Sequence, residues 1–325
     1  MKETLLHMLK AKENGYVSGQ EISNVLNCSR TAVWKHVSEL RSAGYEIEAV
    51  QKKGYRLLRS PDAVTPEEIL SRLKSEKLGK KVVYHTSLKS TQEMAHLEAA
   101  KNAEEGVLVV ADEQTGGRGR LGRSWHSPAG TGIWMSLVLK PRIALQKAPQ
   151  LTLLTAVGVV RAIEKETGLA ADIKWPNDIL LNGKKIVGIL TELQAEADQI
   201  HSVIIGMGMN INQKKEHFPE DIAAIATSLS AESGKEYSRA GLIAAVMLEL
   251  EELYKVYLKD GFGLIKLLWE SRAQSLGKRI TARNLNGTLT GFAKGITDEG
   301  VLLLEDDEGM VHSIYSADIE ITTTT

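Results

Sequence analysis

The stretch GGRGRLGRSW, residues 116–125, places four glycines and three arginines within ten positions. Its G-x-G-x-x-G pattern, which starts at Gly117, also occurs in dinucleotide-binding folds. Such a fold needs a buried strand before the glycines and a helix that begins at the third. The apolar run at 106–112 predicts the strand, but the segment after the third glycine contains a proline and two further glycines and predicts an extended loop. The stretch therefore excludes a dinucleotide-binding fold.

Other interpretations of this glycine–arginine loop are a phosphate loop, a disordered tract or a flexible turn. The kinase and Walker A phosphate loops are excluded because their accompanying signatures do not occur in the sequence. Disordered arginine–glycine tracts are longer and repetitive, whereas this loop lies between two predicted strands. A solvated flexible turn stays open. The arginines beside Trp125 favour an anion site, because guanidinium groups bind carboxylate or phosphate bidentately.

The composition is that of a globular protein of 325 residues, 43% hydrophobic and 25% charged, and this length predicts two or three domains. The net charge is −1, but residues 1–60 carry ten Lys/Arg against six Asp/Glu, and residues 275–325 carry four against eight. The single cysteine, Cys28, excludes an intramolecular disulfide and a cysteine-rich zinc site. Because the sequence has neither a signal peptide nor a spanning apolar run, we expect a cytoplasmic protein without membrane contact.

The basic N-terminal segment predicts a winged helix-turn-helix. Ser18 and Ser29 are placed to cap two short helices that are joined by a turn at 27–28. EIEAV and GYRLL then flank QKK, which predicts two strands around a basic wing. In such modules the second helix enters the major groove of DNA. A module that makes only protein contacts is the alternative, and Trp34 on the second helix fits either core or surface.

The rest of the chain divides into a long mixed segment and a glycine-rich end. SPDAVTP, residues 60–66, is a linker by composition and precedes a helix predicted over 67–75. Strands and helices then mix, with a hairpin predicted at Asn182–Gly183, and helices are predicted over 238–270 with a break at Asp260–Gly261. In the last fifty or so residues, spaced glycines separate short β-type runs, which predicts a small barrel of about five strands.

A second segment, KWPNDILLNGKKIVGI at 174–189, places charged residues beside the predicted hairpin. Asn177 and Asp178 stand at the entrance of one strand, and Lys184 and Lys185 begin the next. Because residues alternate faces along a strand, only one of the two lysines can point into a pocket. An ordinary solvated lysine pair is the alternative interpretation.

Five motifs occur together in the order found in one enzyme family. They are S-T-Q at 90–92, Q-T-G-G-R-G-R-L-G-R-S-W at 114–125, K-W-P-N-D at 174–178, G-K-K-I-V-G-I-L-T-E at 183–192 and G-M-G-M-N-I-N at 206–212. With its N-terminal module, essentially the whole chain resembles the bifunctional biotin–protein ligases that also repress the biotin operon. Leu121 departs slightly from the family pattern, which sometimes has another basic residue there.

The resemblance implies an α+β fold in three domains. A winged helix-turn-helix DNA-binding domain is expected at 1–60 and a central mixed-sheet α/β domain that binds biotin and ATP at 61–273. A small SH3-like β-barrel is expected at 274–325.

The resemblance also implies the chemistry. Biotin is activated with ATP to biotinyl-5′-AMP and transferred to a lysine of a biotin carboxyl carrier protein, as in an AMP-forming biotin–[acetyl-CoA-carboxylase] ligase. ATP, biotin and Mg²⁺ are the expected cofactors, with the Mg²⁺ bound to ATP and not held in a protein cage. With biotinyl-5′-AMP as corepressor, a homodimer is expected to bind operator DNA and repress genes of biotin synthesis and transport. The reaction needs no enzyme nucleophile, which agrees with the absence of a nucleophile motif.

The matching motifs carry the family's site residues onto this chain. The implied catalytic residues are Lys185, Arg120 and Asp178. The implied biotin-binding residues are Ser90, Thr91, Gln92, Gln114, Arg118, Gly119, Arg120, Lys185, Gly188 and Gly206. The implied adenylate- or ATP-binding residues are Gly117, Arg118, Arg120, Arg123, Trp125, Asn177, Asp178, Lys185 and Asn210. The expected DNA-binding residues are Ser29, Arg30, Thr31, Lys35, Lys52, Lys53 and Arg56. The backbone is expected to leave room for the ligand near Gly117, Gly188, Gly206 and Gly208.

Two alternative functions stay open. A lipoate–protein ligase belongs to the same superfamily, although the K-W-P-N-D and R-G-R-x-G-R motifs with a helix-turn-helix favour biotin. A biotin-responsive repressor without catalysis is the other, although the presence of Arg120, Asp178 and Lys185 favours a working enzyme.

Overall fold

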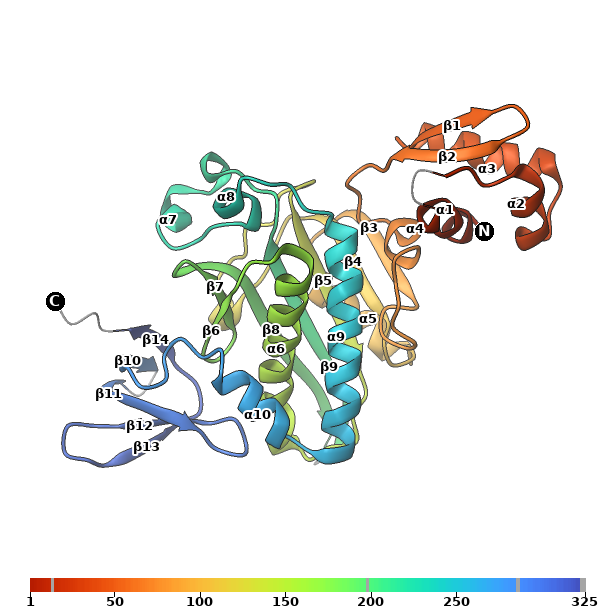
Figure 1. Cartoon of the computed structure of the whole chain (residues 1–325). Coiled ribbons are helices and arrows are strands. Elements are labelled where there is room, and N and C mark those ends of the chain that lie inside the picture. The colour runs from red at the N-terminus through yellow and green to blue at the C-terminus, as the bar shows by residue number, and fades with distance from the viewer. Residues whose placement is uncertain (13–14, 197–198, 285–286, 322–325) are drawn as a thin grey trace.

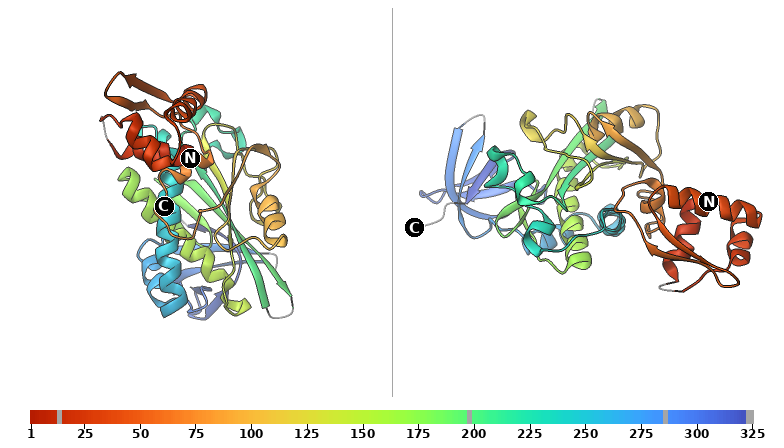
Figure 2. Two further views of the ribbon diagram at one scale, coloured as in Figure 1. Left: turned by 90° about the vertical axis from the view of Figure 1, so that its right-hand side faces the viewer. Right: turned by 90° about the horizontal axis from the view of Figure 1, so that it is seen from above.

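The computed structural model describes residues 1–12, 15–196, 199–284 and 287–321. Its three parts follow one another in space as they do in the chain (Figure 1). The N-terminal helices and hairpin lie at one end, a large sheet with helices on its faces lies in the middle, and a small sheet lies at the other end (Figure 2). Within the described ranges we find no helix that is long and apolar enough to cross a membrane.

The N-terminal part is a winged helix-turn-helix, as the sequence predicts. Its elements are α1 (Lys2–Ala11), α2 (Gly19–Leu26), α3 (Arg30–Ser42), β1 (Glu46–Val50) and β2 (Gly54–Arg59). Ser18 and Ser29 cap α2 and α3 by accepting hydrogen bonds from the N–H groups of Glu21 and Ala32. Apolar residues of the three helices form a core of their own, against which the antiparallel β1–β2 hairpin packs.

A seven-stranded sheet forms the middle of the molecule, in the order β3-β4-β5-β9-β8-β7-β6. Only the β3–β4 pair is parallel among the described strands of this sheet. The strands are β3 (Val82–Leu88), β4 (Leu108–Gln114), β5 (Gly132–Leu139), β6 (Asp172–Lys174), β7 (Asp178–Leu181), β8 (Lys184–Glu196) and β9 (Gln199–Asn210). The predicted hairpin at Asn182–Gly183 is confirmed: both residues have positive φ and connect β7 to β8.

Helices cover both faces of the central sheet. The helices are α4 (Pro66–Leu70), α5 (Thr91–Ala100), α6 (Ala148–Thr167), α7 (Glu220–Ala223), α8 (Leu229–Ser233), α9 (Arg239–Asp260) and α10 (Gly263–Glu270), with short 3-10 turns at Arg120–Gly122, Leu145–Lys147 and Lys215–His217. Helices α6 and α9 pack together on the face toward which Leu108 and Val110 point (Figure 1). Helix α5 covers the opposite face, toward which Val109 points, because side chains alternate along a strand. The break predicted at Asp260–Gly261 separates α9 from α10.

The C-terminal residues form a five-stranded antiparallel sheet in the order β13-β12-β11-β10-β14. Its strands are β10 (Arg279–Asn284), β11 (Gly287–Ile296), β12 (Leu302–Glu305), β13 (Val311–Ile314) and β14 (Asp318–Ile321). Their apolar residues join the core of the central part, and Trp175 Nε1 donates a hydrogen bond to the Gly300 carbonyl at 3.2 Å. Residues 322–325, the end of the predicted domain, lie outside the described residues. The C-terminal sheet is therefore firmly docked onto the central one.

The helix predicted over 67–75 is shorter than expected and ends at Leu70. In a continuing helix the Glu68 carbonyl would accept the N–H of Arg72. Instead the Ser71 hydroxyl donates to the Glu68 carbonyl at 2.9 Å, and the Arg72 N–H donates to the Ile69 carbonyl. The serine side chain thus competes with the helical hydrogen bond and stops α4.

A buried carboxylate on α9 fixes the turn that follows α4. Glu251 is 4% exposed and accepts hydrogen bonds from the N–H groups of Glu76, Lys77 and Leu78 at 2.9, 2.7 and 2.9 Å. Burial by itself raises the pKa of the Glu251 carboxyl. The three N–H donors and the Lys255 ammonium outweigh burial and lower that pKa to about 2.

Replacing Glu251 by glutamine should lower the free energy of unfolding at pH 7 by about 3 kcal/mol, because a neutral amide satisfies these donors poorly. Since the folded-state pKa lies below the unfolded value of 4.5, the carboxylate stabilises fully above that pH and loses its contribution as the pH falls toward 2. Urea unfolding at pH 7 and pH 3 measures both effects. Wild type should lose more stability on acidification than Glu251→Gln, and Glu76→Gln, which alters an exposed ion pair with Lys255, should behave as wild type. An equal acid loss in wild type and Glu251→Gln would contradict this account.

Candidate functional site

A cavity of about 210 Å³ lies between the glycine–arginine loop and strands β7, β8 and β9. Most of the residues predicted to bind a ligand line it: Ser90, Thr91, Gln92, Gln114, Arg118, Gly119, Arg120, Arg123, Trp125, Asn177, Asp178, Lys185, Gly188, Gly206, Gly208 and Asn210. Gly117 lies outside this lining. Segments that are far apart in the sequence therefore meet around one cavity.

Hydroxyl and amide groups gather in one part of this cavity. The Gln114 Oε1 accepts hydrogen bonds from the Thr91 N–H at 2.8 Å and from the Thr91 hydroxyl at 3.0 Å. The Thr91 and Ser136 hydroxyls lie 2.9 Å apart, and Ser136 donates to Gln92 Oε1 at 3.0 Å. Because each group holds the next, this network presents a preorganised polar surface to a small ligand.

Glycines at and beside the cavity make room for protein groups in this structure, and the expectation that they also leave room for the ligand stays a prediction. A Cβ atom on Gly188 or Gly208 would come within 2.7 or 2.3 Å of the Trp125 ring. A Cβ on Gly206 would meet Gln92 Oε1 at 2.6 Å. The Cβ of an alanine at Gly117 would lie 2.6 Å from the Trp125 carbonyl. The glycines thus let Trp125 and Gln92 pack directly on the sheet.

Lys185 and Asp178 form an ion pair inside the cavity. Lys185 Nζ lies 2.6 Å from Asp178 Oδ1 and 5.2 Å from the centroid of the Trp125 ring. The backbone of Lys185 is fixed as well, because its N–H donates to the Ile225 carbonyl and its carbonyl accepts from the Thr227 N–H. Lys184, its neighbour on β8, does not line the cavity within the described residues. The expectation that one lysine of the pair faces a pocket is therefore confirmed.

Arg120 is held between the central sheet and the C-terminal sheet. Its Nη1 donates to Asn177 Oδ1 at 2.9 Å, and its Nη2 donates to the Ser316 hydroxyl at 2.7 Å. Burial lowers the pKa of Arg120 from its usual value, while the carboxylates of Asp318 and Asp178 oppose that effect. Arg120 remains charged at neutral pH, since the ordinary arginine pKa is far above 7.

The two other arginines of the loop bind carboxylates at the rim of the cavity. Arg118 pairs with Glu93 of α5, and Arg123 pairs with Asp318 of β14. Both arginine side chains are more than half exposed. Ion pairs this exposed contribute little to stability, so these contacts can exchange for a ligand at small cost.

Several lining residues escaped the sequence analysis. They are Ser124, His126, Met135, Ser136, Ile189, Leu190, Met207, Phe218, Ile222, Ile225, Ala226 and Asp318. Ser136 is a polar residue in the middle of β5, a strand that is buried along its whole length. A polar residue within such an apolar run is a sequence signal that could have pointed to it. Asp318 comes from the last strand, and no local pattern links it to the loop.

The predicted DNA-binding residues all belong to the N-terminal module, at the start and along α3 and in the β1–β2 hairpin. Arg30, Thr31 and Lys35 are exposed on α3, whereas the Ser29 hydroxyl accepts the capping hydrogen bond. Lys52 and Lys53 are exposed in the turn between β1 and β2. Arg56 pairs with Glu48 at 2.8 Å across the hairpin. Trp34 is 60% exposed on α3, which assigns it to the surface and not to the core.

Comparison with known proteins identifies the family of this chain. It is 56% identical to the bifunctional ligase/repressor BirA of Bacillus subtilis over 99% of this chain and 98% of that protein. The chain belongs to the bifunctional ligase/repressor family. The bifunctional ligase/repressor of Escherichia coli is 28% identical over 93% of this chain and 92% of its own length.

Family models and solved structures agree with this bifunctional ligase/repressor assignment. Residues 84–210 match the biotin/lipoate A/B protein ligase family, residues 2–56 match an HTH domain, and residues 275–321 match the biotin protein ligase C-terminal domain. The structure of Aquifex aeolicus biotin protein ligase in complex with biotin and ATP superimposes with a TM-score of 0.66 at 31% identity. The superposition covers 75% of this chain and 100% of the Aquifex aeolicus chain.

Proposed function

We propose that the chain joins biotin to ATP in this cavity and transfers the biotinyl group to a lysine of a biotin carboxyl carrier protein. The observation that supports this most is the composition of the cavity. Polar groups of Thr91, Gln114 and Ser136 occupy one part, and the charged Lys185 and Arg120 project into the same space. A ligand with a small polar head and a carboxylate tail that meets a phosphate fits this arrangement.

The reaction proceeds in two displacements. A biotin carboxylate oxygen attacks the α-phosphorus of ATP, and the bond to the β-phosphate oxygen breaks, so biotinyl-5′-AMP and pyrophosphate form. The amine of the acceptor lysine then attacks the biotinyl carbonyl carbon. The bond to the phosphate oxygen breaks, AMP leaves and the amine loses a proton. The first displacement brings two anions together, so positioning and positive charge carry the catalysis.

The proposed roles are those that the family resemblance implies, and the position of these residues in the cavity supports them. Lys185 contacts the biotin carboxylate and the phosphate oxygens, and Arg120 holds phosphate beside Asn177. Ser90, Thr91 and Gln114 bind the ureido ring, and Gln92 is fixed by its bonds to Ser136 and to the Ile204 carbonyl. Trp125, which has a buried indole N–H without a partner among the described residues, lies against the adenine. Asp178 and Asn210 contact the adenylate. Arg118 closes the loop over the intermediate and excludes water.

Mg²⁺ is proposed to arrive with ATP. Within the described ranges we find no group of three or more His, Cys, Asp or Glu side chains that could hold a metal ion. Magnesium bound with nucleotides needs only one or two carboxylates in addition to phosphate oxygens. Asp178 and Asp318 line the cavity and fit that requirement. When bound, the ion neutralises phosphate charge.

The N-terminal module is proposed to bind operator DNA as part of a homodimer. Arg30, Thr31 and Lys35 on α3 would face the major groove, and Lys52, Lys53 and Arg56 would reach the DNA backbone. One recognition helix reads few base pairs, so two copies on a palindrome are expected. Biotinyl-5′-AMP acts as the corepressor for genes of biotin synthesis and transport. Because its full-length relatives are bacterial proteins, in whose cells operator DNA lies in the cytoplasm, we propose a cytoplasmic location.

Pyrophosphate release tests the enzymatic half of this proposal. The purified chain should release pyrophosphate only when both biotin and ATP are present, and subsequent addition of a biotin carboxyl carrier domain should yield the biotinylated domain and AMP. Lipoate in place of biotin is the matched control and should give no release above background. Release with lipoate alone would assign the chain to lipoate ligation, and no release with either acid would leave a repressor without catalysis.

A further inference from the structure

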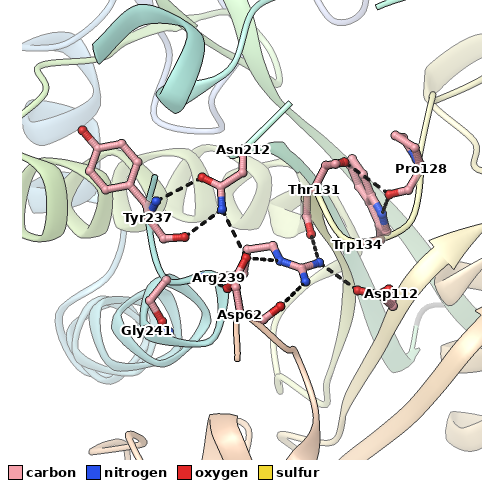
Figure 3. Close-up of polar contacts among 11 residues, drawn as sticks. Asp62, Asp112, Pro128, Thr131, Trp134, Asn212, Tyr237, Arg239 and Gly241 are labelled. Carbon is pink, nitrogen blue, oxygen red and sulfur yellow. Dashed lines mark hydrogen bonds and ion pairs between the residues drawn. The ribbon is translucent and has the colours of Figure 1, made fainter. Parts of the chain in front are cut away.

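Arg239, the first residue of α9, is a long cationic side chain that is only 2% exposed. Figure 3 shows its guanidinium between Asp62 and Asp112. Its Nε donates to Asp62 Oδ2 at 2.8 Å, its Nη1 to Asp112 Oδ1 at 2.8 Å, and its Nη2 to the Asp62 carbonyl at 2.6 Å. A buried charge is tolerated only where partners compensate it. The two carboxylates and the guanidinium therefore fix one another in position.

Two of the contacts of Arg239 lie at the two ends of the segment that contains the glycine–arginine loop. Asp112 is on β4, two residues before Gln114 of the cavity. Nη1 also donates to the carbonyl of Gly132, the first residue of β5, at 3.2 Å. The segment between them, 115–131, is the glycine–arginine loop with its flanks. One guanidinium group therefore joins both stems of the loop that covers the cavity.

The stem on the β5 side is tied to the same cluster by Asn212. The Asn212 N–H donates to the Thr131 carbonyl at 2.7 Å, and its side-chain amide donates to Asp62 Oδ2 at 3.2 Å and to the Tyr237 carbonyl at 2.9 Å. These groups lie together in Figure 3. Asn212 follows Asn210 of the cavity lining by two residues, so strand β9 is connected to the cluster as well.

The other member of the cluster, Asp62, belongs to the linker between the DNA-binding module and the central sheet. It lies after the end of β2 at Arg59 and before the start of α4 at Pro66. Besides the guanidinium, its carboxylate accepts a hydrogen bond from the Arg239 N–H at 3.0 Å, where the N-terminus of α9 favours negative charge. The linker is thus bound to Arg239, whose guanidinium also binds the two loop stems.

We propose that Arg239 is a positioning residue that couples the glycine–arginine loop to the DNA-binding module through Asp62. A change in the loop stems when the loop closes over biotinyl-5′-AMP alters the position of the guanidinium, and Asp62 carries that change into the linker. This inference rests on the proposed corepressor function. Coupling of this kind is reciprocal. The factor by which the ligand raises the affinity for the operator is the factor by which the operator raises the affinity for the ligand.

Asp62→Ala tests the linker arm without touching the cavity. Asp62 is 38% exposed as a side chain, and Arg239 keeps its bonds to Asp112 and Gly132 in this variant, so folding should be preserved. Biotin-dependent pyrophosphate release should stay within about twofold of wild type, while the gain in operator affinity on addition of biotin and ATP should fall about tenfold. Glu76→Gln removes the exposed ion pair between Glu76 and Lys255 of α9. It is the control and should keep the full gain in operator affinity.

Asp112→Ala tests the other arm. It should lower the ligand-dependent gain in operator affinity to a similar extent and raise the KM for biotin several-fold with kcat little changed. Because both arms act through one guanidinium, the double variant should lose no more of the gain than either single variant. Losses that multiply in the double variant would overturn a shared coupling through Arg239.

The outcomes separate the inference from the function on which it rests. If wild type gains no operator affinity with biotin and ATP, and sedimentation shows equal dimerisation with and without them, the corepressor function itself fails. If wild type gains affinity and Asp62→Ala keeps the full gain, the coupling role is overturned. Equal loss of operator affinity by Asp62→Ala in the presence and absence of ligand would also overturn it, because that result indicates a structural role only.

Discussion

Lys185→Met should slow formation of biotinyl-5′-AMP by about 10³-fold, the scale of effect seen when one preorganised charge or donor is removed from a reacting anion. The Lys185 ammonium lies in the cavity, 2.6 Å from Asp178 Oδ1. Our proposal assigns it to contact both the biotin carboxylate and the phosphate. Methionine keeps the unbranched shape and most of the length of the side chain and removes the charge. Single-turnover measurement of the adenylate with saturating biotin and ATP isolates this step from transfer.

Lys184→Met provides the matched control for this effect. The two lysines are adjacent on β8, but Lys184 is not among the described residues that line the cavity. The same change of charge and shape at Lys184 should therefore leave the rate within about twofold, since side chains alternate along the strand. Equal rate losses in the two variants would show that the net charge of the hairpin matters and that Lys185 has no specific role.

Arg120→Ala should lower kcat/KM for ATP by about 100-fold. Its guanidinium is fixed by Asn177 and by Ser316, so it is preorganised toward the cavity and needs no rearrangement to meet phosphate. Initial rates of pyrophosphate release at varied ATP measure the effect. The stability of the variant, measured by thermal unfolding, should fall only slightly because no buried carboxylate depends on Arg120 alone among the described residues.

Two further variants define what Arg120 contributes. Arg142→Ala removes an exposed arginine outside the cavity lining and should leave kcat/KM unchanged. Ser316→Ala removes the hydrogen bond from the C-terminal sheet and should produce only a small part of the Arg120 effect. If Ser316→Ala proved as damaging as Arg120→Ala, the C-terminal sheet would be positioning the arginine, and the Asn177 contact would be secondary.

Much of the fold could be predicted because its signals are local. Ser18 and Ser29 cap helices of the N-terminal module by accepting hydrogen bonds from N–H groups three residues on, and Asn182–Gly183 turns a hairpin through its own positive φ angles. The winged helix-turn-helix, the central strands and the break before α10 were predicted for the same reason. The end of α4 was missed because the Ser71 hydroxyl competes with the backbone for one carbonyl, and helix-forming patterns do not report such competition.

The candidate site was predicted from motifs, and its residues meet around one cavity, but the contacts within it were not predictable. Sequence patterns gave no indication that Trp125 packs on Gly188 and Gly208, or that Gln92 fills the space beside Gly206. The glycines were expected to admit ligand, because a pattern reveals that space is needed without revealing which group occupies it.

The sequence by itself determined most helices and strands, that only one lysine of the hairpin could face a pocket, and, through its motifs, which family the chain resembles. These properties depend on periodicity, on neighbours along the chain and on short motifs. Only the tertiary structure decided that Asp318 meets Arg123, that Ser316 meets Arg120, and that Arg239 joins the linker to the loop stems. These partners lie more than a hundred residues apart in the chain, so packing of the core brings them together, and no local pattern encodes the pairing.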